Sequence, residues 1–243
     1  MAVSYHSGLK TQPLLECFHL RLLRLDLNIV DMEEIFVILA LIISIVLHEM
    51  AHGYAANWLG DPTARLQGRL SANPLVHLDP IGSIIVPAFL FFSSAGILFG
   101  WAKPVPYNPY NLSDQKYGEA KVAAAGPAMN IAIAVLFGLL VRFSGDIGLS
   151  SSFVSLASYI VYINILLACF NMIPLPPLDG SKIIVAFLPY GAQQKYRELT
   201  MLVERYGIFA TFAFIFIFIN IMWKPFSELV SVIFKFITGM QGF

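Results

Sequence analysis

Charged residues are scarce in this 243-residue chain, and cysteine is nearly absent. Only 12% of the residues are charged, against about 25% in a typical soluble domain. The 15 basic and 15 acidic residues cancel to a net charge of zero, so the basic surface typical of nucleic-acid binding is missing and we expect no nucleic-acid partner. Two cysteines, Cys17 and Cys169, are too few to predict a disulfide framework.

Apolar residues are abundant instead: 58% of the chain is hydrophobic, and the mean hydropathy is +0.73. Five apolar stretches are candidate membrane segments, because a transmembrane helix needs about 17–25 predominantly apolar residues. They are Ile35–Leu59, Ile81–Phe99, Tyr117–Phe143, Phe153–Ile173 and about Tyr206–Met222. The second contains Pro87 and Gly96, and could be a broken span or a re-entrant loop. We predict an all-α polytopic membrane protein with five to six membrane segments, embedded in the lipid bilayer.

The two ends of the chain differ from this core. Residues 1–31 are mixed in composition and do not match a signal peptide. Because Met32 directly precedes the first span, this extension could be a surface helix or an over-extended reading frame, and we expect it to be dispensable. Residues 226–237 place apolar side chains on one face, which predicts an amphipathic interfacial helix. The predicted division is therefore 1–31 extension, 32–225 membrane core and 226–243 C-terminal helix.

The first span contains a group of ionisable residues, His48-Glu49-Met50-Ala51-His52. On a helix His48 and His52 are one turn apart, so both imidazoles point the same way and can bind one Zn²⁺. Glu49 can then act as general base on a metal-bound water. The alternative is a set of interfacial polar residues at a helix end. Ionisable residues are costly at membrane depth, so we favour the metal site.

A catalytic zinc needs one more protein ligand. Asp179 is the best candidate, because Pro174, Pro176 and Pro177 break the preceding span and leave a carboxylate beside irregular backbone, which is tolerated where it lines a cavity. A compatible alternative is that Asp179 caps a helix at 181–188. His77 could be an auxiliary or gating ligand, but we favour an interfacial histidine there.

The loop after the first span alternates loosely between apolar and polar residues from Ala64 to Leu70. This alternation predicts a small re-entrant β-hairpin. Such a hairpin could pair with an extended peptide by strand addition.

Three motifs together resemble the site-2 protease family of intramembrane zinc metallopeptidases. They are His48-Glu49-x-x-His52, Gly126-Pro127-Ala128-Met129-Asn130 and Asn171-x-x-Pro174-x-x-Pro177-Leu178-Asp179-Gly180. They occur in the family's order, and the resemblance covers roughly Glu33 to Met222. With no room for a PDZ or CBS domain, the chain is similar to the minimal branch of the family.

The resemblance implies broken helices around a single zinc held by His48, His52 and Asp179, with Glu49 as catalytic base. Asn130 and Asn171 would position the substrate or the oxyanion, although close helix packing is an alternative role for Asn130. The implied substrate is a membrane protein cleaved within or near a transmembrane segment. The family also implies an active site nearer the cytosolic face.

A different class of function remains open at this point. A non-catalytic zinc-binding membrane scaffold or carrier would use the same histidine and aspartate ligands, but it would not need Glu49. The sequence indicates neither the substrate nor an oligomeric state.

Overall fold

The computed structural model describes residues 32–85 and 102–240, which form helices, turns and loops without a β-strand. Within these residues, four helices are long and apolar enough to cross a membrane: Ile35–Trp58, Gly118–Arg142, Ser151–Asn171 and Phe209–Thr238. The prediction of an all-α, multi-pass membrane protein is therefore confirmed. The predicted count of five to six segments is not, because most of the stretch 81–99 lies outside the described residues. Its first part, Pro80–Ile85, is π-helical.

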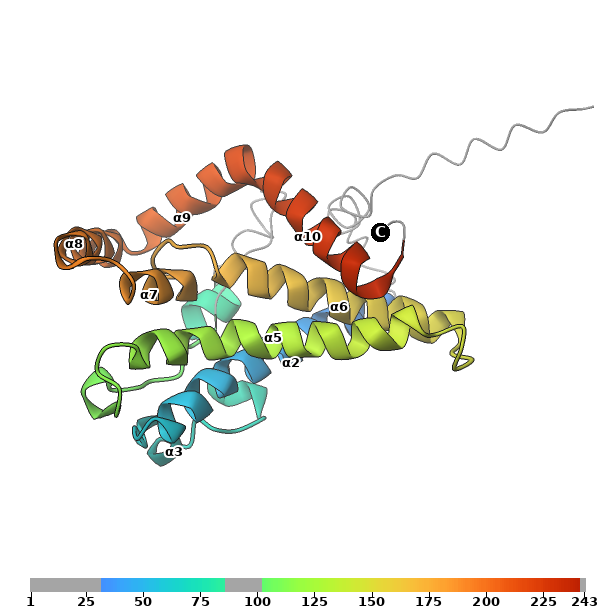
Figure 1. Cartoon of the computed structure of the whole chain (residues 1–243), viewed down its shortest axis with the longest axis horizontal. Coiled ribbons are helices and arrows are strands. Elements are labelled where there is room, and N and C mark those ends of the chain that lie inside the picture. The colour runs from blue at the N-terminus through green and yellow to red at the C-terminus, as the bar shows by residue number, and fades with distance from the viewer. Residues whose placement is uncertain (1–31, 86–101, 241–243) are drawn as a thin grey trace, which may run out of the picture.

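Three long helices form the central layer of the molecule (Figure 1). They are α2 (Met32–Trp58), α5 (Gly118–Arg142) and α6 (Ser151–Asn171), and each contacts the other two. Helices α2 and α6 run in one direction and α5 runs in the opposite one. Ser150 starts α6 by accepting a hydrogen bond from the Phe153 N–H. Gly60, with a φ of 102°, allows the turn that ends the first helical segment.

The C-terminal helical segment lies across this layer. It consists of α9 (Ile208–Ile217), the π-helical η4 (Phe218–Met222) and α10 (Trp223–Thr238), and the chain bends between α9 and α10 (Figure 1). The predicted helix at 226–237 is present as part of α10. Its apolar face packs on α5 and α6, where Phe226, Val230 and Phe234 are buried beside Val161 of α6. This face is therefore occupied by protein.

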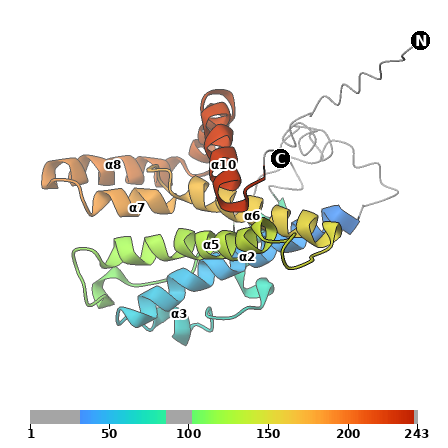
Figure 2. The same cartoon turned by 45° about the vertical axis from the view of Figure 1, so that its right-hand side comes forward.

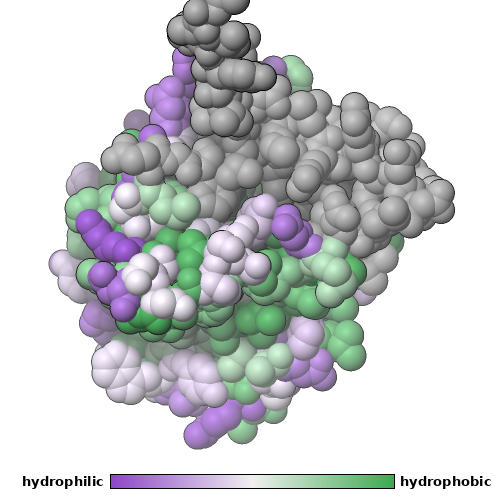
Figure 3. Space-filling view, turned by 90° about the vertical axis from the view of Figure 1, so that its right-hand side faces the viewer, coloured by the Kyte–Doolittle hydropathy of each residue, from purple (hydrophilic) through white to green (hydrophobic). Residues whose placement is uncertain are grey.

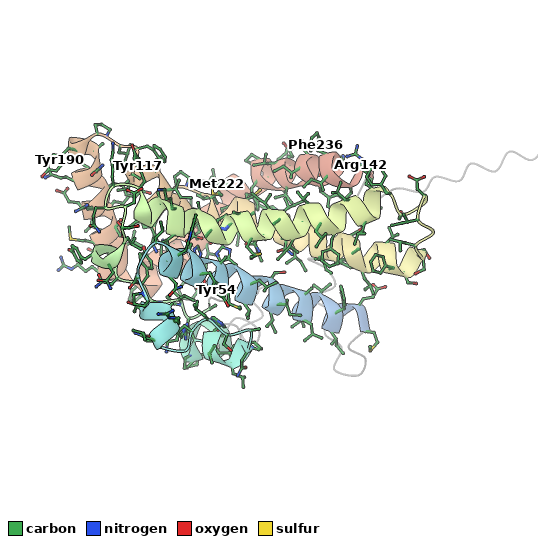
Figure 4. The ribbon with its side chains drawn as sticks, turned by 60° about the horizontal axis from the view of Figure 1, so that its bottom comes forward. Tyr54, Tyr117, Arg142, Tyr190, Met222 and Phe236 are labelled. Atoms are coloured by element: carbon green, nitrogen blue, oxygen red, sulfur yellow. The ribbon has the colours of Figure 1, made fainter. Side chains whose placement is uncertain are left out.

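Arg142 joins the C-terminal end of α5 to α10. Its Nη1 donates to the carbonyl of Phe236 over 2.9 Å (Figure 4). In the coloured part of the face that Figure 3 presents, hydrophobic and hydrophilic residues are intermixed.

The β-hairpin predicted at 64–70 is wrong. The chain instead forms the short helix α3 (Thr63–Leu66), followed by a turn at Gly68 with a φ of 66°. The reason lies just upstream, where Asp61 Oδ1 accepts hydrogen bonds from the Thr63 N–H and hydroxyl, and the N–H groups of Leu66 and Gln67 then bond within the helical turn. Such local hydrogen bonds from a side chain to the nearby main chain compete with extended structure.

Asp61 also holds the connector that precedes α5. Its fully buried carboxylate accepts from the Asn108 N–H at 2.6 Å and from Asn111 Nδ2 at 2.9 Å, beside the short helix η3 (Pro109–Asn111). Burial raises the pKa of this carboxyl, but hydrogen bonds from Thr63, Asn111 and Asn108 outweigh burial and lower the pKa below its ordinary value. The extended connector is thereby tied to the end of α2.

The remaining described elements lie mostly at the end of the molecule where α2 and α6 finish. They are η1 (Pro74–His77), α7 (Asp179–Val185) and α8 (Tyr190–Tyr206). Figure 2 shows α7 between α8 and α5, and α7 contacts α5 directly. This arrangement brings the start of α7 to the central layer.

Replacing Phe234 tests the contact of α10 with the central layer. Phe234 is 1% exposed, whereas Phe236 on the same helix is 78% exposed. Phe234→Ala should therefore destabilise the protein by about 3 kcal/mol, because a buried ring leaves a cavity. Phe236→Ala is the matched control and should have little effect. Thermal unfolding of both variants in detergent measures the difference, and equal midpoints would show that α10 does not pack as described.

Candidate metal centre

Three potential metal ligands meet where α2, α5 and α7 come together. His48 and His52 lie one turn apart on α2, and their Nε2 atoms are 3.0 Å from each other. Asp179, the first residue of α7, brings its Oδ2 to 3.2 Å from His48 Nε2 and 3.3 Å from His52 Nε2. Both histidines are buried. This group could hold a metal ion.

The hydrogen bond at Nδ1 of each imidazole determines that Nε2 faces the other potential ligands. His52 Nδ1 lies 2.7 Å from the carbonyl oxygen of Val122, which can only accept, so Nδ1 carries the proton. His48 Nδ1 lies 2.6 Å from Asn130 Oδ1. Both rings therefore present an Nε2 lone pair to Asp179, as metal-ligating histidines do.

The spacing of these atoms suits zinc. Ligands about 2.0–2.1 Å from a tetrahedral Zn²⁺ are about 3.3 Å apart, and the three atoms here are separated by 3.0–3.3 Å. Asp179 Oδ2 is buried and has no hydrogen-bond partner. Two lone pairs and a carboxylate oxygen repel one another unless a cation lies among them. The residues present therefore fit a zinc ion.

Gly126 of α5 makes room for this group. A Cβ at position 126 would lie 2.6 Å from His48 Nε2 and closer still to His52 Nε2. The glycine of the second motif thus allows α5 to pass directly against the two imidazoles. Pro127 follows it inside the helix.

Gly180 places Asp179. A Cβ there would collide with the main-chain atoms of Met172 and Ile173, so only glycine lets the start of α7 approach the end of α6 this closely. Leu178 occupies the N-cap position, and Asp179 does not cap the helix.

Glu49 lies beside the extended connector. Its Oε2 accepts a hydrogen bond of 2.9 Å from the Val105 N–H. The connector is itself held by Arg69, a buried residue whose guanidinium donates to the carbonyls of Val76, Lys103 and Pro104. The sequence did not indicate this role of Arg69, because two of the three carbonyls it binds lie 34 and 35 residues away in the chain.

The other predicted site residues lie in different surroundings. Asn130 is fully buried, accepts from His48 and donates through Nδ2 to Asn164. Asn171 Nδ2 donates to the carbonyl of Leu167 in its own helix. His77 is buried, with Nε2 2.9 Å from the carbonyl of Ser71, and does not belong to the His48, His52 and Asp179 group. A role for Asn130 or Asn171 toward the substrate stays a prediction, as does gating by His77.

The helices and the ligand group define a membrane protein with a buried metal centre. Comparison with known proteins gives the family. The model of Peptidase family M50 matches residues 146–218. YwhC of Bacillus subtilis, named as a zinc metalloprotease, is 35% identical over 192 residues, which are 75% of this chain and 80% of YwhC.

A second relative is Rip2 of Mycolicibacterium smegmatis, also named as a zinc metalloprotease. It is 31% identical over 146 residues, 60% of this chain and 54% of Rip2. No solved structure matches the chain. The chain therefore belongs to peptidase family M50, the site-2 protease family of zinc metalloproteases, and zinc is its cofactor.

Gly126→Ala tests the close approach of α5 to the imidazoles. The added methyl group would occupy the space between His48 and His52, so we expect most of the bound zinc to be lost. Gly145→Ala is the matched control, because a Cβ at Gly145 meets no atom within 4 Å. Zinc per chain, measured by elemental analysis of the purified proteins, compares the two. Full zinc content in Gly126→Ala would contradict this geometry.

Proposed function

We propose that this protein is an intramembrane zinc metalloprotease that hydrolyses a peptide bond within or near a transmembrane segment of a membrane-protein substrate. The observation that carries the proposal is the meeting of His48, His52 and Asp179, with Glu49 next to the first ligand in a helix able to span the membrane. Membership of a family of zinc metalloproteases supports it.

In this proposal His48, His52 and Asp179 would hold the zinc through Nε2, Nε2 and Oδ2. A bound zinc would supply Lewis acidity beside the attacking water. Glu49 takes a proton from the attacking water and delivers it to the amide nitrogen as the C–N bond breaks. The Val105 N–H, bonded to one carboxylate oxygen, keeps the Glu49 side chain oriented and leaves the other oxygen for the proton.

The extended connector suits a role beside the reacting peptide. Arg69 and Asp61 fix it at two points, and Val105 fixes it to Glu49. A helical substrate hides its carbonyls in its own hydrogen bonds, so the segment to be cleaved must unwind locally before it reacts. We propose that unwinding precedes hydrolysis.

The distribution of basic residues supports an active site nearer the cytosolic face. The end of the molecule that holds α3, α7 and α8 carries many of the described lysines and arginines: Arg65, Arg69, Lys116, Lys121, Lys182, Lys195, Arg197 and Arg205. Positively charged loops are retained in the cytosol. Because His52 lies in the last two turns of α2 and Asp179 begins α7, the metal centre is close to this end (Figure 1).

Glu49→Gln separates proteolysis from zinc binding alone. The change is nearly isosteric and leaves the three ligands untouched, so zinc content should be retained while cleavage falls by orders of magnitude. The double variant His48→Ala/His52→Ala should lose both. The assay is zinc per chain together with cleavage of a model transmembrane substrate. Retained cleavage in Glu49→Gln would rule out this mechanism, and a zinc-binding scaffold or carrier would show no cleavage even in the wild type.

Substrate helicity tests the unwinding step. Replacing a glycine in the cleaved segment with leucine should slow cleavage, because each replacement makes unwinding harder by about 1 kcal/mol. The measurement is the cleavage rate for a series of substrates with the same scissile bond. A matched glycine replacement far from that bond is the control. A rate indifferent to helicity would remove the unwinding step and leave the protease intact.

A further inference from the structure

A row of buried polar side chains continues from His48 into the middle of the helical layer. Asn130 of α5 bonds to His48, Asn164 of α6 bonds to Asn130, and Ser44 of α2 bonds to Asn164. Asn130 and Asn164 are fully buried and Ser44 is 3% exposed. Neither Asn164 nor Ser44 lies in any of the three sequence motifs.

The direction of every hydrogen bond in this row is set by two main-chain carbonyls. The Ser44 hydroxyl donates to the carbonyl of Ala40 at 2.7 Å, so its oxygen is left to accept from Asn164 Nδ2 at 2.9 Å. Asn164 Nδ2 also donates to the carbonyl of Ile160 at 2.9 Å. A carbonyl can only accept, so the Asn164 amide cannot be turned over without losing these bonds.

The fixed orientation of the Asn164 amide in turn determines the orientation of the Asn130 amide beside the metal centre. Asn164 Oδ1 must accept, and it does so from Asn130 Nδ2 at 2.8 Å. Asn130 then has its Oδ1 facing His48, where it accepts from Nδ1–H at 2.6 Å. His48 is left with its Nε2 lone pair toward Asp179.

We propose that Asn164 and Ser44 are positioning residues of the metal centre, which fix the Asn130 amide so that His48 presents Nε2 to zinc. This inference rests on the proposed ligand role of His48. Without Asn164, nothing in the row distinguishes the oxygen of the Asn130 amide from its nitrogen, and an Nδ2 turned toward His48 Nδ1 would oppose the required ring state. Partners of metal-bound histidines typically contribute 10–100-fold to metal affinity.

The alternative is that this row of side chains only joins α2, α5 and α6, since buried polar groups also stabilise helix packing in membranes. The chain offers a matched pair that separates the two roles. Ser158 of α6 is also fully buried and donates to the carbonyl four residues earlier at 2.7 Å, as Ser44 does. Its other contact is Met240 Sδ at 3.6 Å, so Ser158 is outside the row.

The test compares Ser44→Ala and Ser158→Ala in the full chain. Both should lower thermal stability to a similar degree, but only Ser44→Ala should weaken zinc binding, by about 3-fold, measured by competition with a chelator. Asn164→Leu, which keeps the volume and removes the amide, should weaken it by about 10-fold. With Co²⁺ in place of zinc, its ligand-field absorption should change in Ser44→Ala and stay as in wild type in Ser158→Ala.

The proposal is overturned if Ser44→Ala binds zinc as tightly as Ser158→Ala and gives the same Co²⁺ spectrum, whatever Asn164→Leu does. The comparison of the two alanine variants decides the matter even if Asn164→Leu does not fold. His48→Ala keeps the result separate from the proposed function. Full zinc binding in His48→Ala would overturn the metal assignment itself. If His48→Ala loses zinc but the two serine variants bind it with equal affinity, only the positioning role is overturned.

Discussion

The structure depends on gathering two imidazole lone pairs and a carboxylate oxygen at one buried point in a membrane protein. His48, His52 and Asp179 bring these atoms within 3.0–3.3 Å of one another. Such a group is unfavourable in a low-dielectric interior without a cation to balance it. Helices α2 and α7 supply these atoms, and α5 supplies hydrogen-bond partners for the imidazoles and, at Gly126, the space beside them.

Small residues and chain breaks provide the space. Gly126 lets α5 pass against the imidazoles, and Gly180 lets α7 begin against the main chain at the end of α6. Asp179 can therefore reach α2 although 127 positions separate it from His52 in the sequence. A side chain at either glycine would collide with its neighbours and push these elements apart.

Buried polar side chains hold the loops in place through hydrogen bonds. Arg69 donates to the main-chain carbonyl of Lys103 in the connector, and Asp61 accepts from the Asn108 N–H and the Asn111 side-chain amide. The Val105 N–H donates to Glu49. A buried charged side chain that receives or donates several hydrogen bonds is stable where an isolated one is not. The Glu49 carboxylate is thus held from outside its own helix.

Much of the protein follows from its sequence alone. Apolar length determines the spanning helices, because a bilayer requires about 20 apolar residues in a row. The i,i+4 spacing of His48 and His52, with a carboxylate after a proline-broken span, determined the candidate ligands. These signals are local, or depend on the cost of polar residues in lipid, so they can be read from one chain.

Tertiary structure decided the rest. Alternation at 64–70 suggested a hairpin, yet the chain forms a helical turn there beside the Asp61–Thr63 hydrogen bonds. The apolar face of α10 packs on α5 and α6. Three residues lie outside the sequence motifs: Asn164, Ser44 and Arg69. Their roles depend on partners in other helices or loops, because Asn164 bonds to Ser44 across 120 positions and Arg69 bonds to Pro104 across 35. Sequence fixes which side chains must find a partner in the membrane, and only the packing of the helices determines which partner each one finds.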